Sequence, residues 1–105
     1  MSDWTSPQGL NMEEAQNLRG ELITRMLDSI KQVREVDSGY VLRFSASQQD
    51  LLMVSEWIHV ERICNPFLRF KLSVESNSGP ISVEMAGPSG TQDFLRSELA
   101  LNRWM

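Results

Sequence analysis

Apolar residues recur every three or four positions in the first part of the chain, and this spacing is typical of an amphipathic helix. The apolar stripe consists of Ala15, Leu18, Leu22, Met26 and Ile30. Asn11 precedes the stripe and Glu14 follows it by three residues, which is the arrangement of a capping box with Asn in place of Ser or Thr. The pattern therefore predicts a helix over residues 12–31.

The period then changes to two, which is typical of strands. Residues 33–36 and 40–44 flank the loop Asp37-Ser38-Gly39, which ends in a glycine suited to a left-handed backbone position. Further along, residues 67–75 and 81–85 alternate apolar and polar side chains on either side of a Ser-Asn-Ser-Gly turn. The four segments predict two antiparallel hairpins, and the inward side chains of the third strand are Leu68, Phe70, Leu72 and Val74.

Two further helices follow from start and stop signals. Ser47 is an N-cap with Asp50 three residues later, and the helix that begins there runs to about Cys64, because Pro66 pushes the residue before it out of helical dihedrals. Its inward face consists of Met53, Trp57, Val60 and Cys64. After the glycine-containing segment 87–90, a last, shorter helix carries Phe94, Leu95, Leu99 and Leu101.

The order of elements is thus α-β-β-α-β-β-α. Two hairpins with one apolar face each, and helices with apolar stripes, predict an α+β two-layer sandwich: an antiparallel four-stranded sheet with the helices packed on one face. The pattern leaves the strand order open, including a sheet completed across a dimer. Residues 1–11 have no periodicity and predict a mobile N-terminal tail, and residues 12–105 predict a single domain.

Composition narrows the class of protein. The chain has 105 residues, 41% hydrophobic and 23% charged, as in ordinary globular domains, and no apolar run approaches the ~18–20 residues of a membrane span. Cys64 is the only cysteine, which excludes an internal disulfide and a multi-cysteine metal cage, so we expect neither a metal nor a cofactor. Together with the absence of a secretory signal pattern, this favours the cytoplasm. The net charge of −4 disfavours nucleic acid and anionic membranes as partners.

Two residues near the end of the middle helix are the weak catalytic candidates. Cys64 lies where the helix dipole disfavours a thiolate, and His59 lies ~140° around the helix, so a local Cys-His pair is excluded. Glu61 lies on the apolar stripe, where a carboxylate has to cap backbone donors, meet an arginine or occupy a cleft with a raised pKa. We favour structural roles for both. A small enzyme or thiol-dependent sensor centred on Glu61 and Cys64 is the alternative.

The sheet face opposite the helices holds the candidate residues for binding a ligand or partner. Arg43, Arg69 and Lys71 are predicted to gather there, with Phe67 nearby. Basic residues beside an aromatic ring are typical of proteins that bind single-stranded nucleic acid. Three carboxylates dilute the charge, namely Glu35, Glu75 and Glu84. A solvated face or a dimer interface is therefore favoured over nucleic-acid binding.

Several segments resemble a family of small uncharacterised bacterial proteins over about residues 18–96. The segments are Gly39-Tyr-Val-Leu-Arg-Phe44, Glu61-Arg-Ile-Cys-Asn-Pro-Phe-Leu-Arg-Phe70, Gly79-Pro-Ile81 and Gly87-Pro-Ser-Gly90 with Phe94-Leu95. In that family the middle helix ends in Glu-Arg-x-Cys-Cys-Pro-Phe, and this chain has Asn65 in place of the second cysteine. Any metal or disulfide role of paired cysteines would be lost here. The resemblance implies fold boundaries but no activity.

The function predicted from these observations is a non-enzymatic cytoplasmic module that self-associates or binds a protein partner. Open sheets have two edge strands, which proteins usually cover or protect. A two-fold homodimer would cover the strand at residues 33–36 or the open face, with Arg69 and Lys71 against Glu84 of the second copy.

Overall fold

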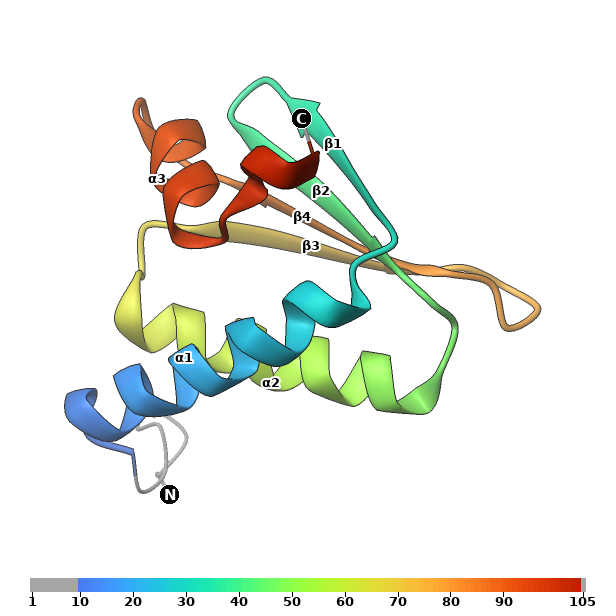
Figure 1. Cartoon of the computed structure of the whole chain (residues 1–105), viewed down its shortest axis with the longest axis horizontal. Helices are drawn as coiled ribbons and strands as arrows, with labels where there is room; N and C mark the ends of the chain where they lie inside the picture. The colour runs from blue at the N-terminus through green and yellow to red at the C-terminus, as the bar shows by residue number, and fades with distance from the viewer. Residues whose placement is uncertain (1–9, 105) are drawn as a thin grey trace, which may run out of the picture.

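The computed structural model describes residues 10–104, so most of the predicted N-terminal tail lies outside the described residues. The elements follow the predicted order (Figure 1). They are α1 (Met12–Ser29), β1 (Gln32–Val36), β2 (Gly39–Phe44), α2 (Gln48–Cys64), β3 (Arg69–Val74), β4 (Ile81–Ala86), α3 (Thr91–Glu98) and the short 3₁₀ helix η2 (Leu101–Trp104). No helix within the described range is long and apolar enough to cross a membrane.

The four strands form one antiparallel sheet in the order β1-β2-β4-β3. The two hairpins therefore meet along β2 and β4, which are the central strands. Their inward side chains are the most apolar and the most buried of the sheet, namely Tyr40, Leu42 and Phe44 of β2 and Ile81, Val83 and Met85 of β4. Burial on this face accounts for the clean alternation in both sequences.

The helices pack against one face of the sheet, which confirms the two-layer α+β prediction. α1 and α2 lie side by side and run in opposite directions (Figure 1). On α2, Trp57 is fully buried and meets Phe70 of β3 edge-to-face, with ring centroids 5.5 Å apart. On α3, Arg96 donates a hydrogen bond to the buried hydroxyl of Tyr40 at 3.1 Å. The buried residues form a continuous hydrophobic core between the two layers.

Both predicted N-caps are present. The Asn11 side chain accepts a hydrogen bond from the Glu14 backbone, and the Glu14 carboxylate accepts one from the Asn11 backbone, which completes the capping box of α1. The Ser47 hydroxyl accepts a hydrogen bond from the Asp50 backbone at the start of α2. Such caps satisfy backbone donors that the first helical turn cannot pair internally. α1 ends two residues before its predicted limit.

The first hairpin differs from its prediction. Its loop has two residues, Asp37 and Ser38, and Gly39 is the first residue of β2, where its φ is not positive. The glycine is required instead by space, because a Cβ at this position would lie 1.7 Å from the carbonyl oxygen of Met85 on β4. The prediction of a three-residue loop with a left-handed Gly39 was therefore wrong, since close approach of two strands selects glycine as strongly as dihedral angle does.

Edge strand β3 is shorter than predicted and less covered than its neighbours. It begins at Arg69, and its inward residues Leu72 and Val74 remain 41% and 56% exposed. In the same cross-strand rows, their β4 neighbours Val83 and Ile81 are almost completely buried. The helix layer thus does not cover the C-terminal end of β3. The β3–β4 turn extends beyond the ends of α1 and α2 (Figure 1).

Candidate functional site

The buried carboxylate of Glu61 is surrounded by hydrogen-bond donors from two helices. Its Oε2 accepts from Trp57 Nε1 and from Arg19 Nε, each at 2.9 Å, and its Oε1 accepts from Asn65 Nδ2 at 2.7 Å. Glu61 is completely inaccessible to solvent. Of the alternatives open to a carboxylate on an apolar stripe, the structure thus shows the meeting with an arginine.

Arg19 extends this cluster to a third helix. While its Nε contacts Glu61, its Nη1 donates to Glu98 at the end of α3 at 2.8 Å, and its side chain is 15% exposed. Burial alone would lower the pKa of Arg19, but the neighbouring carboxylates of Glu61 and Glu98 outweigh burial and raise that pKa. The guanidinium therefore remains charged and joins α1, α2 and α3.

Cys64, the last residue of α2, is half-buried beside this cluster. Burial raises the pKa of its thiol, the negative charge of Glu61 raises it further, and the positive charge of Arg19 opposes both effects. Nucleophilic cysteines need the opposite change, because the thiolate is the reactive form. The local electrostatics therefore favour an unreactive thiol at neutral pH.

Glu61 is also poorly placed to act as a general base or as a nucleophile. A general base has to be within hydrogen-bond reach of a substrate proton, and a nucleophilic carboxylate has to approach a reacting atom. Both oxygens of Glu61 are occupied by protein donors, and the residue has no solvent-accessible surface. His59 of α2 is exposed and does not contact Glu61 through any hydrogen bond in the described range. The arrangement around Glu61 is typical of a structural cluster that joins helices.

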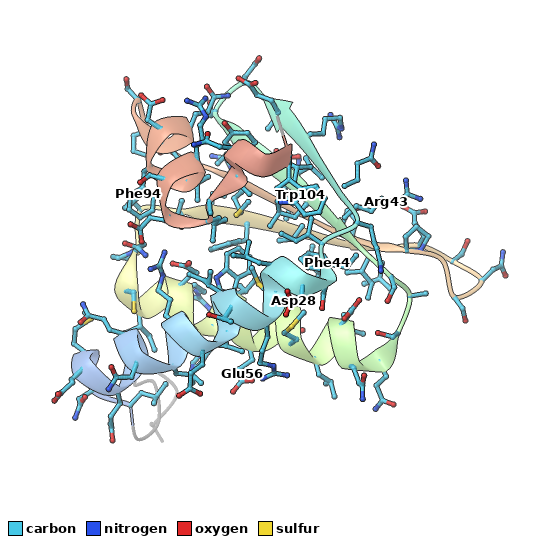
Figure 2. The ribbon with its side chains drawn as sticks, in the orientation of Figure 1. Asp28, Arg43, Phe44, Glu56, Phe94 and Trp104 are labelled. Atoms are coloured by element: carbon cyan, nitrogen blue, oxygen red, sulfur yellow. The ribbon has the colours of Figure 1, made fainter. Side chains whose placement is uncertain are left out.

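The outer face of the sheet, opposite the helices, brings three of the predicted binding residues together. Directly opposed residues in antiparallel strands point to the same face, and these rows run Gln32–Arg43–Ser82–Ser73, Arg34–Val41–Glu84–Lys71 and Val36–Gly39–Ala86–Arg69. Arg43, Arg69 and Lys71 therefore share this outer face with Arg34, and all four side chains are exposed. Figure 2 shows the alternation on β2, where Phe44 points toward the helices and Arg43 points away from them.

Phe67 occupies a different place. It lies in the turn between α2 and β3, and its ring meets that of Phe94 on α3 at a centroid distance of 5.2 Å. α3 covers the inner face of the sheet, so the structure does not bring Phe67 together with Arg43, Arg69 and Lys71. The outer face consequently has no aromatic ring among the residues of its four strands.

Charge is distributed unevenly between the outer face and the rest of the molecule. The strand residues of the outer face include four cations and one carboxylate, Glu84, which amounts to a net charge of +3. The whole chain has a net charge of −4, so the rest of the chain has −7. None of the four basic side chains forms an ion pair with another residue in the described range 10–104.

A shallow hollow of about 310 Å³ lies on the β1–β2 half of this face. Arg34 and Arg43 line it with one carboxylate at its rim, and the full set of lining residues is Gln32, Arg34, Val41, Arg43, Glu75, Pro80 and Ser82. Two guanidinium groups at one hollow can form paired hydrogen bonds with carboxylates.

Comparison with family models, curated proteins and solved structures found no match to this chain. The family resemblance of residues 18–96 therefore stays a prediction. The function is therefore inferred from the geometry of the described residues alone.

Three residues of these clusters were not predicted from the sequence. Arg19 is one of several polar residues on α1, and only the tertiary fold brings it to Glu61, 42 positions away. No sequence pattern indicates the role of Asn65, whose side-chain amide donates a hydrogen bond to Glu61. Arg34 shares a face with Val36 and alternates with Val33 in a short strand without a clear apolar side, so its position on the outer face required the register of β1 against β2.

Proposed function

We propose that this protein is a non-enzymatic protein-interaction module whose outer sheet face binds an acidic, extended segment of a partner protein. The observation that carries the proposal is the separation of charge: the strand residues give this face a net charge of +3, or +2 with Glu75 of its hollow, on a chain of net charge −4. Such a face attracts carboxylates and orients an approaching partner. The rest of the molecule repels the same ligand, which restricts binding to this face.

The chemistry of the face favours a peptide over a nucleic acid. Arg34 and Arg43 offer planar guanidinium donors that match carboxylates as well as phosphates. Proteins that bind single-stranded nucleic acids add aromatic rings for base stacking, and the strand residues of this face include none.

The clusters near Cys64 support the non-enzymatic part of the proposal. Glu61 is saturated by Trp57, Arg19 and Asn65, and the pKa of Cys64 is raised by burial and by Glu61. Both features disfavour the alternative of a small enzyme or thiol-dependent sensor at this position.

The test is binding of a fluorescently labelled oligoglutamate peptide, measured by anisotropy at low salt. Arg43→Glu should weaken binding roughly tenfold or more, because it replaces an attractive charge on the face by a repulsive one. The matched control is Arg62→Glu on the exposed side of α2, which changes the net charge equally at another surface. We expect the control to retain more than half of the wild-type affinity.

Equal losses of peptide affinity in Arg43→Glu and Arg62→Glu, or no peptide binding by the wild type, would overturn the assignment of this face. A single-stranded oligonucleotide of the same charge is the competing probe. Tighter binding of the oligonucleotide, sensitive to Arg43→Glu, would replace the peptide by nucleic acid as the ligand class.

A further inference from the structure

The outer edge of β3 has backbone groups that no strand within residues 10–104 pairs. The backbone N–H of Glu75 donates to the carbonyl of Pro80, which identifies this facing pair as a hydrogen-bonded one. Hydrogen-bonded and non-hydrogen-bonded pairs alternate along an antiparallel ladder, so Ser73, Lys71 and Arg69 also direct their backbone groups toward β4. The N–H and C=O groups of Phe70, Leu72 and Val74 therefore point away from β4, at the free edge.

The side chains of the same residues form an apolar row along this edge. Phe70, Leu72 and Val74 all point to the inner face of the sheet, and the latter two are about half exposed. A flat edge with free backbone groups and exposed apolar side chains is a template for pairing with another strand. Proteins that remain monomeric usually protect such an edge with inward charges, a proline or a bulge. Between Arg69 and Val74 the inward positions have no charge and no proline.

The opposite edge of the sheet is different. β1 has the charged, exposed residues Arg34 and Glu35 and lies against η2. Both edge strands have exposed charges on the outer face, but only β1 has an inward-pointing one, Glu35, and an inward charge on an edge strand disfavours pairing with a second strand. This distribution disfavours a dimer through residues 33–36, and it leaves β3 as the edge that is open to pairing.

We propose that β3 pairs antiparallel with β3 of a second copy of this chain, about a two-fold axis that passes beside Leu72. The two sheets then form one continuous eight-stranded sheet. Leu72 lies opposite Leu72 of the second copy, and Phe70 lies opposite Val74, so the half-exposed apolar row is covered by the same row of the other copy. Cross-strand apolar pairs of this kind stabilise sheets.

Charge on the outer face and the apolar row on the inner face together select this register among the neighbouring ones. With the axis beside Leu72, Arg69 lies opposite Glu75 of the second copy. A shift of two residues in one direction places Lys71 opposite Lys71, which is repulsive. A shift in the other direction keeps an attractive pair, Lys71 opposite Glu75, but it places Phe70 opposite Ser76, two residues beyond the end of β3, and leaves Phe70 without an apolar neighbour. The two-fold axis beside Leu72 is the register that pairs the whole strand and opposes unlike charges.

This self-association does not depend on the proposed binding of acidic segments. The dimer uses the edge of β3, whereas the peptide test uses Arg43, which lies on β2. Oligomeric state and peptide affinity are separate measurements, so either proposal can fail while the other is retained.

The first test is sedimentation equilibrium of the full chain at tens of micromolar. We expect a species of twice 12.0 kDa, and Leu72→Lys or Val74→Lys should convert it to a monomer, with unchanged circular dichroism because both side chains are exposed. The control is Glu35→Lys, which adds a lysine on the same face at the opposite edge and should leave the dimer intact. A monomeric wild type, or a dimer that withstands both β3 variants, would overturn the proposal.

The second test concerns the register. Arg69→Glu and Glu75→Arg should each weaken the dimer roughly fivefold or more, because each places like charges opposite one another. The double variant Arg69→Glu/Glu75→Arg restores opposite charges at both ends of the paired strands and should recover most of the wild-type affinity. Additive losses in the double variant would rule out the axis beside Leu72.

Discussion

At the scale of single residues, the cluster around Glu61 shows how a charged side chain is accommodated inside a small core. A buried carboxylate is costly unless donors replace the water that it has lost. Trp57, Arg19 and Asn65 provide those donors here. Asn65, just after the end of α2, has the amide hydrogen that the second oxygen of this carboxylate accepts.

Removing the charge of Glu61 should therefore destabilise the folded protein. We expect Glu61→Gln to lower the free energy of unfolding by about 3 kcal/mol, since the largely buried guanidinium of Arg19 loses its innermost partner. The matched variant Glu98→Gln removes a 39% exposed partner of the same arginine and should cost less than ~1 kcal/mol. Urea unfolding measures both, and comparable losses would contradict the role assigned to Glu61.

Cys64 provides a prediction about pH. Burial and the charge of Glu61 raise the pKa of its thiol, so at any given pH the folded protein has less thiolate than the unfolded chain. Modification by a thiol reagent at pH 7 should be slower in native protein than in denaturant, and its rate should level off at a higher pH. Because the unfolded thiol loses its proton first, this group's contribution to stability is present below pH ~8.5 and decreases above it. Native modification as fast as in denaturant would indicate an activated cysteine.

At the scale of elements, alanine substitutions at two glycines with different surroundings are expected to change stability in opposite directions. Gly39→Ala would place a Cβ 1.7 Å from the Met85 carbonyl oxygen and should cost at least ~2 kcal/mol, because two central strands must separate. Gly20→Ala, within α1, meets no atom within 4 Å and should increase the free energy of unfolding by roughly 0.5–1 kcal/mol. Thermal unfolding of both variants checks the difference. A tolerated alanine at position 39 would mean that the β2–β4 spacing is wider than described.

Most elements could be predicted because their signals are local. The stripe of α1, the caps at Asn11 and Ser47 and the alternation in β4 are each contained in a short segment. The order β1-β2-β4-β3 could not be predicted, because antiparallel hairpins with equivalent apolar faces can join along either strand. In the observed order the apolar residues of β2 and β4 are buried at the centre of the sheet, and β3 lies at the edge with Leu72 and Val74 half exposed.

The candidate sites could be predicted only in part. Arg43, Arg69 and Lys71 share a face because residues two apart on a strand do so, and the sheet then brings the strands together. Phe67 has the same spacing from Arg69, but it lies in a turn, where the period of two no longer applies. The link from Arg19 to Glu61 depends on how α1 crosses α2, and no sequence period indicates that contact.

At the scale of the whole molecule, the hydrophobic core joins all the helices to the sheet. We therefore expect residues 12–105 to unfold in one cooperative transition, as single domains of this size usually do. Far-ultraviolet circular dichroism reports the helices, and in a Trp4→Phe/Trp104→Phe variant the fluorescence of the buried Trp57 reports the packing between α2 and β3. The two probes should give coincident urea curves at equal protein concentration, and separated midpoints would indicate that the helix layer can detach from the sheet.

The meeting of β2 with β4 also has a consequence for the time course of folding. Each hairpin and each helix is built from contacts close in sequence, whereas Phe44 and Ile81 pair only after α2 and β3 have been traversed. Closing so long a loop costs conformational entropy before the contacts between β2 and β4 can stabilise it. Pairing of these two strands is therefore expected to limit the rate of folding. In stopped-flow experiments, shortening Leu42 or Val83 to alanine should mainly slow refolding, and substitutions in the Asp37-Ser38 turn should mainly accelerate unfolding.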